Sequence, residues 1–167
     1  MQEGRGAPVG RSGRARALLL AAAGLTLAID QASKALVLAR LGPDGHIRLA
    51  GDVFAIVVRR NPGGAFGMFP DAPLFFFVAT VAIVVGAMVW GWRTPQLAVP
   101  VGMIVGGGLG NLLDRLARGP HLFRGQVVDF IYLSFWPTFN LADSAIVVGV
   151  ALLLLTTSRV AREESAG

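Results

Sequence analysis

Four aspartates lie inside or beside long apolar segments of the sequence, and they are its strongest candidates for chemistry. They are Asp30, Asp114, Asp129 and Asp143. A charged side chain in or next to a membrane segment is energetically costly, so each such residue is a functional candidate by default. If the apolar segments are membrane helices, all four carboxylates gather at the same end of them. Two carboxylates held close together share a proton, so one can activate water as a base while the other protonates the substrate.

Asp129 and Asp143 are the candidates for that pair. Asp129 stands between Val128 and Phe130 without a basic neighbour, and a carboxyl in such an apolar setting should have a raised pKa and retain a proton. Asp143 follows Asn140 by three residues, a spacing typical of an N-cap with an acid in the first helical turn. Capping and catalysis are compatible, and catalysis is the favoured interpretation for both aspartates.

Asp30 and Asp114 fit a supporting role better. Asp30 and Lys34 are spaced i, i+4, so they share one helical face and could simply neutralise each other. Asp114 ends its predicted helix, where the helix dipole disfavours an acid, and it therefore needs a partner. Asn111 and Arg115 are both within its reach. The sequence thus predicts that these two aspartates shape a site rather than react in it.

The composition excludes several other chemistries. The absence of cysteine rules out a thiol nucleophile and a cysteine zinc site, and the two histidines lie far apart, outside any metal-binding spacing. Ser33, beside the only lysine, Lys34, points about 100° away around the helix, so a Ser–Lys hydrolase is geometrically poor. Paired carboxylates need neither a metal nor another cofactor. The net charge of +5 comes from arginines scattered among apolar runs, so we attribute it to membrane topology and expect no nucleic-acid partner.

The elements that must position these residues are four predicted membrane spans. They cover residues 17–39, 72–92, 97–115 and 141–158. Hydrophobic residues make up 54% of the chain and charged residues only 15%, which fits a surface that faces lipid. The predicted fold class is an all-α membrane protein with a single membrane domain over 14–158. A disordered basic tail over 1–13 and a second tail over 159–167 flank it.

An even number of spans places both termini on one side of the membrane. A cluster of four arginines before residue 17 favours the cytoplasm as that side. The segments 40–71 and 116–140 then lie outside, and the β-branched run and turn residues of the first predict a small sheet or hairpin at the membrane surface. The N-terminal pattern could also belong to a cleaved signal peptide, but the polar cluster at 30–34 continues the helix where a cleavage site would be expected.

Glycines and asparagines near the aspartates have both structural and functional interpretations. The third span repeats glycine every four residues, a pattern that allows close helix packing in membranes: Gly102, Gly106 and Gly110. Gly107, Asn111 and Asp114 share another face, which would turn a polar stripe toward the site. Asn61 and the glycines after it, including Gly64, could form only a turn or could present backbone groups to an extended peptide.

Five segments of the chain form an ordered series. They are Asp30-Gln31-Ala32-Ser33-Lys34, Asn61-Pro62-Gly63-Gly64-Ala65-Phe66, the run from Gly107 to Arg115, Val127-Val128-Asp129-Phe130 and the run from Phe139 to Ser144. Together they resemble the bacterial lipoprotein signal peptidases, or type II signal peptidases, over residues 17–158. The chain departs from the family pattern at residues 62–64 and in a shorter stretch between Asp129 and Asp143.

The resemblance implies an intramembrane aspartic endopeptidase of the bacterial cytoplasmic membrane, with its active site near the outer leaflet. Such enzymes remove the signal peptide of prolipoproteins before a diacylglyceryl-modified cysteine and are inhibited by the cyclic peptide globomycin. The resemblance implies that Asp129 and Asp143 are the catalytic pair. It also implies a β-cradle around residues 45–70 and a short periplasmic helix or lid over 116–126.

Further residues are implied to line the site, bind substrate or shape it. They are Asp30, Lys34, Asn61, Gly64, Gly107, Asn111, Asp114, Arg115, Asn140 and Ala142. No metal or cofactor is implied. The expected partners are diacylglyceryl prolipoproteins and membrane lipids, and the protein is expected to act as a monomer.

A small proton-coupled transporter is the alternative from a different class, with the buried acids acting as proton relays. Transport would predict ionisable residues distributed through the depth of the membrane. The second predicted span has no charged residue, and the acids cluster at one end. The sequence therefore favours the peptidase.

Overall fold

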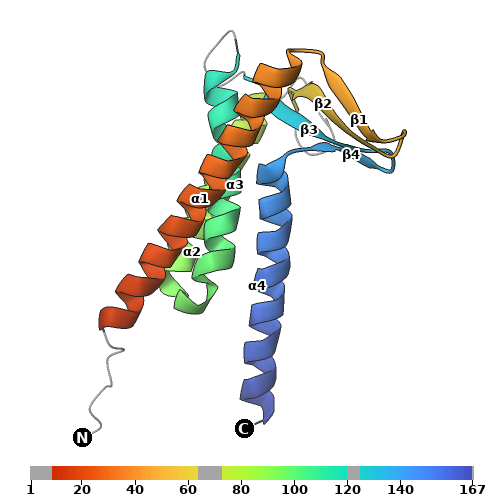
Figure 1. Ribbon diagram of the computed structural model, residues 1–167. Coiled ribbons are helices and arrows are strands. Elements are labelled where there is room, and N and C mark those ends of the chain that lie inside the picture. The colour runs from red at the N-terminus through yellow and green to blue at the C-terminus, as the bar shows by residue number, and fades with distance from the viewer. Residues whose placement is uncertain (1–8, 64–72, 120–124, 167) are drawn as a thin grey trace, which may run out of the picture.

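The protein forms a bundle of long helices with a small antiparallel sheet at one end (Figure 1). The computed structural model describes residues 9–63, 73–119 and 125–166. The helices are α1 (Val9–Leu41), α2 (Pro73–Arg93), the short 3₁₀ helix η2 (Pro95–Leu97), α3 (Ala98–Ala117) and α4 (Leu141–Ala166). The strands are β1 (His46–Ala50), β2 (Phe54–Asn61), β3 (Val127–Leu133) and β4 (Trp136–Phe139). The fold class predicted from the sequence, apolar helices with a small sheet, is confirmed.

Within the described residues, four helical segments are long and apolar enough to cross a membrane. They are Ser12–Leu41, Leu74–Arg93, Pro95–Ala117 and Leu141–Arg159. In the third segment, 67% of the residues in its apolar stretch are buried inside the protein, whereas in the other three segments the share is only 11–17%. The helix α3 therefore forms the core, and α1, α2 and α4 present apolar side chains outward, as a lipid environment requires.

Two helices extend beyond the predicted spans. The helix α1 begins at Val9, so residues 9–13 are helical and the predicted disordered tail over 1–13 is wrong for that part. At the other end of the chain, α4 continues through residues 159–166 of the predicted second tail. Extending an existing helix costs far less than nucleating one, so a long apolar span carries its polar flanks into helical structure. The start of α1 and the end of α4 lie at the same end of the bundle, opposite the sheet (Figure 1).

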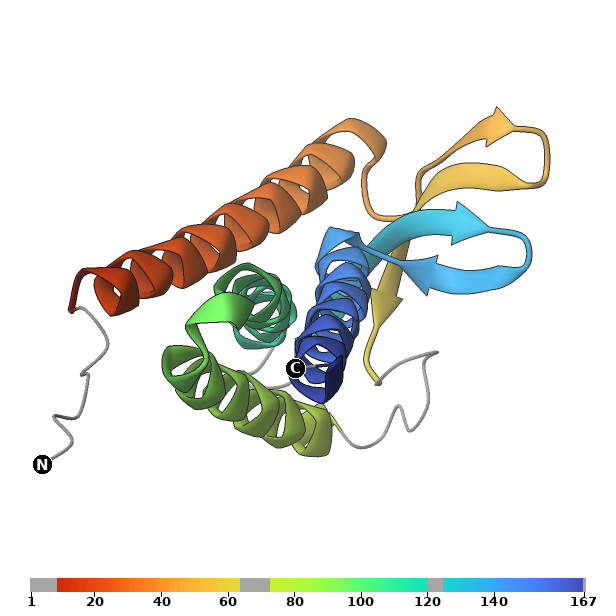
Figure 2. The same ribbon diagram turned by 90° about the horizontal axis from the view of Figure 1, so that it is seen from below.

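Three consecutive glycines place α3 at the centre of the bundle. Successive residues of a helix point about 100° apart, so neighbouring side chains face different directions. Gly106 lies against α1, Gly107 against α4 and Gly108 against α2, and none of the three positions has room for a side chain. Gly102 and Gly110 continue the contact with α1, which confirms the predicted packing role of the glycine repeat. Figure 2 shows the other helices arranged around α3.

The sheet has two chemically different faces. Its order is β1-β2-β3-β4 with antiparallel pairing, and residues directly opposite one another share a face. One row across all four strands is apolar: Ile47, Ile56, Ile131 and Phe139. A row on the other face runs from Arg48 through Ala55 to Tyr132. Such a two-faced sheet suits the boundary between lipid and water, where the sequence predicted a sheet.

The connection from α3 to β3 contains the segment for which a helix or lid was predicted. The helix α3 ends at Ala117, and the described residues 118–119 and 125–126 are not helical. Residues 120–124 lie outside the described residues, so the rest of that prediction stays a prediction. Two backbone hydrogen bonds join the ends of this connection: Gly125 N donates to Arg115 O at 2.9 Å, and Gln126 N donates to Arg118 O at 3.3 Å.

Candidate active site

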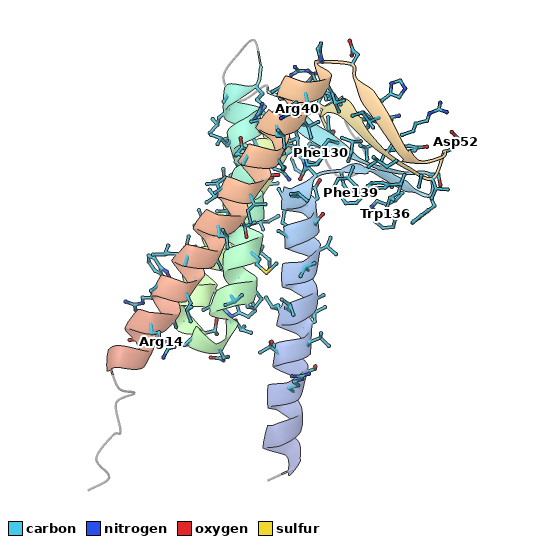
Figure 3. All side chains as sticks on the ribbon, viewed as in Figure 1. Arg14, Arg40, Asp52, Phe130, Trp136 and Phe139 are labelled. Atoms are coloured by element: carbon cyan, nitrogen blue, oxygen red, sulfur yellow. The ribbon has the colours of Figure 1, made fainter. Side chains whose placement is uncertain are left out.

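A pocket of about 380 Å³ lies where the sheet meets the helices, and both Asp129 and Asp143 line it. Its remaining walls are largely apolar and come mostly from α2, α3, α4 and β4, with one further residue each from β2 and β3. Figure 3 shows Phe139 and Trp136, two of the lining residues, on the side of the sheet that faces α4. The pocket thus combines a largely apolar surface with two carboxylates, one from β3 and one from the first turn of α4.

Asp143 is held in the first turn of α4 by a reciprocal pair of hydrogen bonds with Asn140. The backbone N–H of Asp143 donates to Asn140 Oδ1 at 2.9 Å, and the backbone N–H of Asn140 donates to Asp143 Oδ2 at 3.3 Å. This arrangement is a capping box, which satisfies two donors at the start of the helix. Asn111 Nδ2 donates to the other oxygen, Asp143 Oδ1, at 2.8 Å. The N-cap predicted from the sequence spacing is confirmed.

Asp129 lies in β3 and is only 4% exposed. Asn140 Nδ2 donates to its Oδ1 at 2.7 Å, and Asn61 Nδ2 donates to its Oδ2 at 3.1 Å. Burial and, next, the negative charge of Asp143 raise the pKa of Asp129, and the two asparagine donors act in the opposite direction; the net result is a pKa of about 6. The sequence prediction of a raised pKa for this carboxyl is therefore confirmed.

Lys34 is the centre of a second, fully buried group of charges. Its Nζ lies 2.8 Å from Asp30 Oδ2 and 2.8 Å from Asp114 Oδ2, and all three side chains are 0% exposed. It also donates to Asn111 Oδ1 at 3.2 Å. The predicted neutralisation of Asp30 by Lys34 is confirmed. Asn111 and Arg115 were expected to lie within reach of Asp114. Arg115 interacts with it electrostatically, whereas the packing of α1 on α3 brings Lys34 into direct contact with this carboxylate.

The two supporting aspartates each hold a backbone group next to one of the pocket carboxylates. Asp30 Oδ1 accepts a hydrogen bond from the N–H of Ala142 at 3.0 Å, one residue before Asp143. Asp114 Oδ2 accepts a hydrogen bond from the N–H of Val128 at 3.1 Å, one residue before Asp129. The buried charges therefore fix the backbone on which both pocket carboxylates stand.

Arg115 joins the pocket to the loop after β2. Its NH2 group donates to Gly63 O at 2.7 Å and its NH1 group donates to Asn111 O at 3.4 Å. The side chain is only 6% exposed, yet its Nε–H has no hydrogen-bond partner among the described residues. Buried donors are rarely left unsatisfied, so this Nε–H is an exception among the described residues.

The charges around the pocket nearly balance. The described residues here include four carboxylates and three cationic side chains: Asp30, Asp114, Asp129, Asp143, Lys34, Arg115 and Arg118. A single proton shared by Asp129 and Asp143 makes this set neutral. Because uncompensated buried charge is costly, the arrangement favours a pocket pair that carries one proton.

The other residues predicted for the site differ in where they lie. Gly107 packs against Ala142 and Ile146 of α4 and does not line the pocket, whereas its neighbour Gly108 does. Gly64 lies outside the described residues. Sequence reasoning missed Gln31 and Arg118, which bind Asp114, although the i, i+4 spacing of Asp114 and Arg118 was a usable signal.

A bundle of apolar helices with two carboxylates in one largely apolar pocket, one from β3 and one from α4, is the arrangement expected of an aspartic hydrolase of the membrane. The family described as signal peptidase (SPase) II matches residues 22–159 of the chain. The chain belongs to this lipoprotein signal peptidase family, whose members are aspartic peptidases that cleave the signal peptides of prolipoproteins. It is therefore a multi-pass membrane protein of bacteria.

Individual relatives agree with this assignment. The chain is 40% identical over 144 residues to a lipoprotein signal peptidase of Rhodococcus jostii, which covers 85% of this chain and 73% of that protein. It is 39% identical to a lipoprotein signal peptidase of Mycobacterium avium, which covers 91% of this chain and 85% of that protein. The fold is similar to that of a bacterial membrane enzyme solved by the in meso method at 2.3 Å resolution, with a TM-score of 0.73, 24% identity and coverage of 91% and 90% of the two chains. The alternative of a proton-coupled transporter is set aside.

Proposed function

We propose that Asp129 and Asp143 are the catalytic pair and that the peptide bond cleaved is the one before a diacylglyceryl-modified cysteine. The observation that carries this proposal is the shared pocket. Both carboxylates line it, and Asn140 hydrogen-bonds to both of them. Acid–base hydrolysis of a peptide requires an ionised carboxylate as the base and a protonated carboxyl as the acid, and two carboxylates in one pocket can supply both.

The proposed reaction uses one water molecule and the single proton of the pair. The ionised carboxylate takes a proton from the water as the water oxygen attacks the carbonyl carbon, and the protonated carboxyl donates its proton to the carbonyl oxygen. When the tetrahedral intermediate collapses, the C–N bond breaks and the leaving amine takes the proton first removed from water. The guanidinium of Arg115, a residue that also lines the pocket, is the proposed hydrogen-bond donor to a substrate carbonyl.

The apolar walls of the pocket suit a lipid-modified substrate. Phe76 and Ile83 line it from α2, Ile104 from α3, and Ile146 and Val147 from α4. These side chains offer no hydrogen bonds, so they favour the acyl chains of a diacylglyceryl group or the apolar part of a signal peptide over a polar segment. We infer that the lipid-modified cysteine enters the pocket from the membrane.

The proposed orientation places both termini in the cytoplasm and the pocket near the outer leaflet. Arg14 lies in α1 at the end of the bundle away from the sheet (Figure 3), and Arg16 lies over the ring of Trp92, beside Arg93 at the end of α2. Basic residues favour the cytoplasmic side. The carboxylates and supporting side chains come from one chain, which supports a monomer as the active unit.

A cleavage assay with two forms of one prolipoprotein tests the proposed substrate. The purified enzyme in detergent or lipid is expected to cleave the diacylglyceryl-modified form and to leave the unmodified form intact, because the unmodified form cannot fill the apolar walls. Mass spectrometry of the products locates the cleaved bond. Globomycin should inhibit the reaction. Equal cleavage of both forms, or cleavage elsewhere than before the modified cysteine, would contradict the proposal.

The pH dependence of cleavage tests the proton on Asp129. Its pKa of about 6 means that the singly protonated pair persists to about pH 6, far above the range of an ordinary aspartate. We expect kcat/KM to fall about tenfold per pH unit on the alkaline side of that value. The hydrogen bond from Asn61 favours the ionised form, so Asn61→Ala should raise the pKa and move the alkaline limb to higher pH.

The matched control for this experiment is Thr80→Val. Thr80 also lines the pocket, but its hydroxyl donates to Phe76 O within α2 at 2.7 Å. The variant should leave the midpoint of the alkaline limb unchanged. A midpoint that moves to lower pH in Asn61→Ala would show that the Asn61 hydrogen bond does not favour the ionised carboxylate.

A further inference from the structure

Gln31 and Arg118 contact one oxygen of Asp114 from two different elements. Arg118 Nε donates to Asp114 Oδ1 at 2.7 Å, and Gln31 Nε2 donates to the same oxygen at 3.2 Å. Arg118 NH2 also donates to Gln31 Oε1 at 3.3 Å. We propose that Arg118, together with Gln31, is a positioning residue for signal-peptide cleavage and acts through Asp114 on Asp129. The proposal rests on Asp129 belonging to the catalytic pair proposed above.

The two oxygens of Asp114 have separate tasks. With Oδ1 occupied by Gln31 and Arg118, Oδ2 is directed at Lys34 Nζ, 2.8 Å away, and at the N–H of Val128, 3.1 Å away. Val128 immediately precedes Asp129 in β3. The rotation of the Asp114 carboxylate therefore sets where the backbone of β3 lies, and a misplacement of about 1 Å in a catalytic group can cost two orders of magnitude in rate.

The same frame reaches the other carboxylate. Gln31 Nε2 donates to Asp30 Oδ2 at 3.1 Å as well as to Asp114 Oδ1, and it donates to Gly110 O at 3.1 Å. Asp30 in turn holds the N–H of Ala142, one residue before Asp143. Gln31 thus bridges the two carboxylates that fix the backbone on either side of the pocket, and Arg118 orients Gln31.

Arg118 also supplies a charge that Lys34 alone does not. Asp114 is 0% exposed and shares the ammonium of Lys34 with Asp30, so the two buried anions have one buried cation between them. Arg118 is 23% exposed and adds the second cation at Asp114. The groups in direct contact with this carboxylate are Lys34 and Gln31 from α1, Arg118 after α3 and the Val128 N–H from β3, and Arg115 of α3 interacts with it electrostatically. Removing Arg118 leaves the frame with an unmatched negative charge.

Kinetics of Arg118→Gln and Arg118→Lys on a diacylglyceryl prolipoprotein test the proposal. Arg118→Gln should lower kcat about tenfold and leave KM unchanged, because substrate binding is retained while the pair is misplaced. Arg118→Lys keeps the charge and should recover most of the rate. The matched control is Arg48→Gln, which breaks a largely exposed ion pair with Asp52 at 3.3 Å and should leave kcat unchanged.

A double-mutant cycle with Asp114→Asn decides whether Arg118 acts through Asp114. Arg118→Gln should have little further effect on kcat in the Asp114→Asn background, since the carboxylate that it orients is gone. If Asp114→Asn does not fold, Gln31→Met serves instead and should also be non-additive with Arg118→Gln. Thermal unfolding of each variant in the same detergent separates misplacement from loss of folded enzyme.

Three outcomes would overturn the proposal: equal kcat losses in both backgrounds, an increase in KM alone, or lower thermal stability with an unchanged kcat of the folded enzyme. The proposed catalytic pair is tested separately by Asp129→Asn. An active Asp129→Asn variant would contradict the proposed catalytic pair. An inactive Asp129→Asn variant together with a normal kcat in Arg118→Gln would contradict only the positioning role of Arg118.

Discussion

Asp129→Asn and Asp143→Asn are each expected to lower kcat about 10⁴-fold while leaving the protein folded. Each substitution keeps the size of the side chain but removes a group that must exchange protons in the proposed reaction. The remaining carboxylate cannot serve as base and acid at once, since the pair is proposed to work with one shared proton. The measurement is single-turnover cleavage of a diacylglyceryl prolipoprotein by each purified variant.

The control is Asp52→Asn. Asp52 is 90% exposed and pairs with Arg48 at the rim of the sheet, away from the pocket, so the variant should retain full activity. Globomycin binding separates loss of chemistry from loss of the pocket, because an amide at either position should still leave the apolar walls intact. Near-normal cleavage by either asparagine variant would remove that residue from the catalytic pair.

The proposed pair could be found from the sequence because its signals are local. Asp129 stands in an apolar run, and Asp143 follows Asn140 by the spacing of a helix cap, so neither assignment needed a long-range contact. The capping hydrogen bonds and the buried position of Asp129 agree with those signals. The glycine repeat of α3 is local in the same sense, because its period alone shows that one face lacks side chains.

The supporting contacts could not be found in this way. Asp30 binds the N–H of Ala142, 112 positions away, and Gln31 binds Asp114, 83 positions away. Such pairs depend on how three helices pack around α3, and helical spacing in one segment carries no information on that arrangement. Spacing alone suggested Asn111 and Arg115 as partners of Asp114, whereas tertiary packing supplied Lys34.

The register of the sheet is a second feature that local sequence patterns did not determine. The strand pattern in segment 40–71 predicted a small sheet or hairpin, but the pairing of β2 with β3 joins segments from opposite halves of the chain. That pairing places Asn61 beside Val127 and so brings its amide to Asp129. The sequence signals were sufficient for the elements, and the register that completes the site came only from their packing.

Lys34→Met is expected to destabilise the protein by about 3–5 kcal/mol, the range for breaking a buried ion pair by removing one partner. Methionine fills a similar volume, so a cavity does not account for the loss. The substitution leaves Asp30 and Asp114 at 0% exposure without the ammonium that lies 2.8 Å from each. Thermal unfolding in detergent, followed by tryptophan fluorescence, measures the change. Arg40→Met, at an exposed position near the end of the same helix, is the control and should be near neutral.

A triple variant separates the charge from the shape of this cluster. Adding Asp30→Asn and Asp114→Asn to Lys34→Met removes all three charges but keeps an amide oxygen available to the N–H of Ala142 and of Val128. Replacing a whole buried ion cluster by neutral side chains costs less stability than leaving two buried carboxylates without their cation. The triple variant should therefore recover more than half of the lost stability. Its activity should stay low, since the amides hold the two backbone groups without the ionic contacts that fix the spacing of Asp129 and Asp143. A triple variant no more stable than Lys34→Met alone would mean that the lysine stabilises the bundle by packing rather than by its charge.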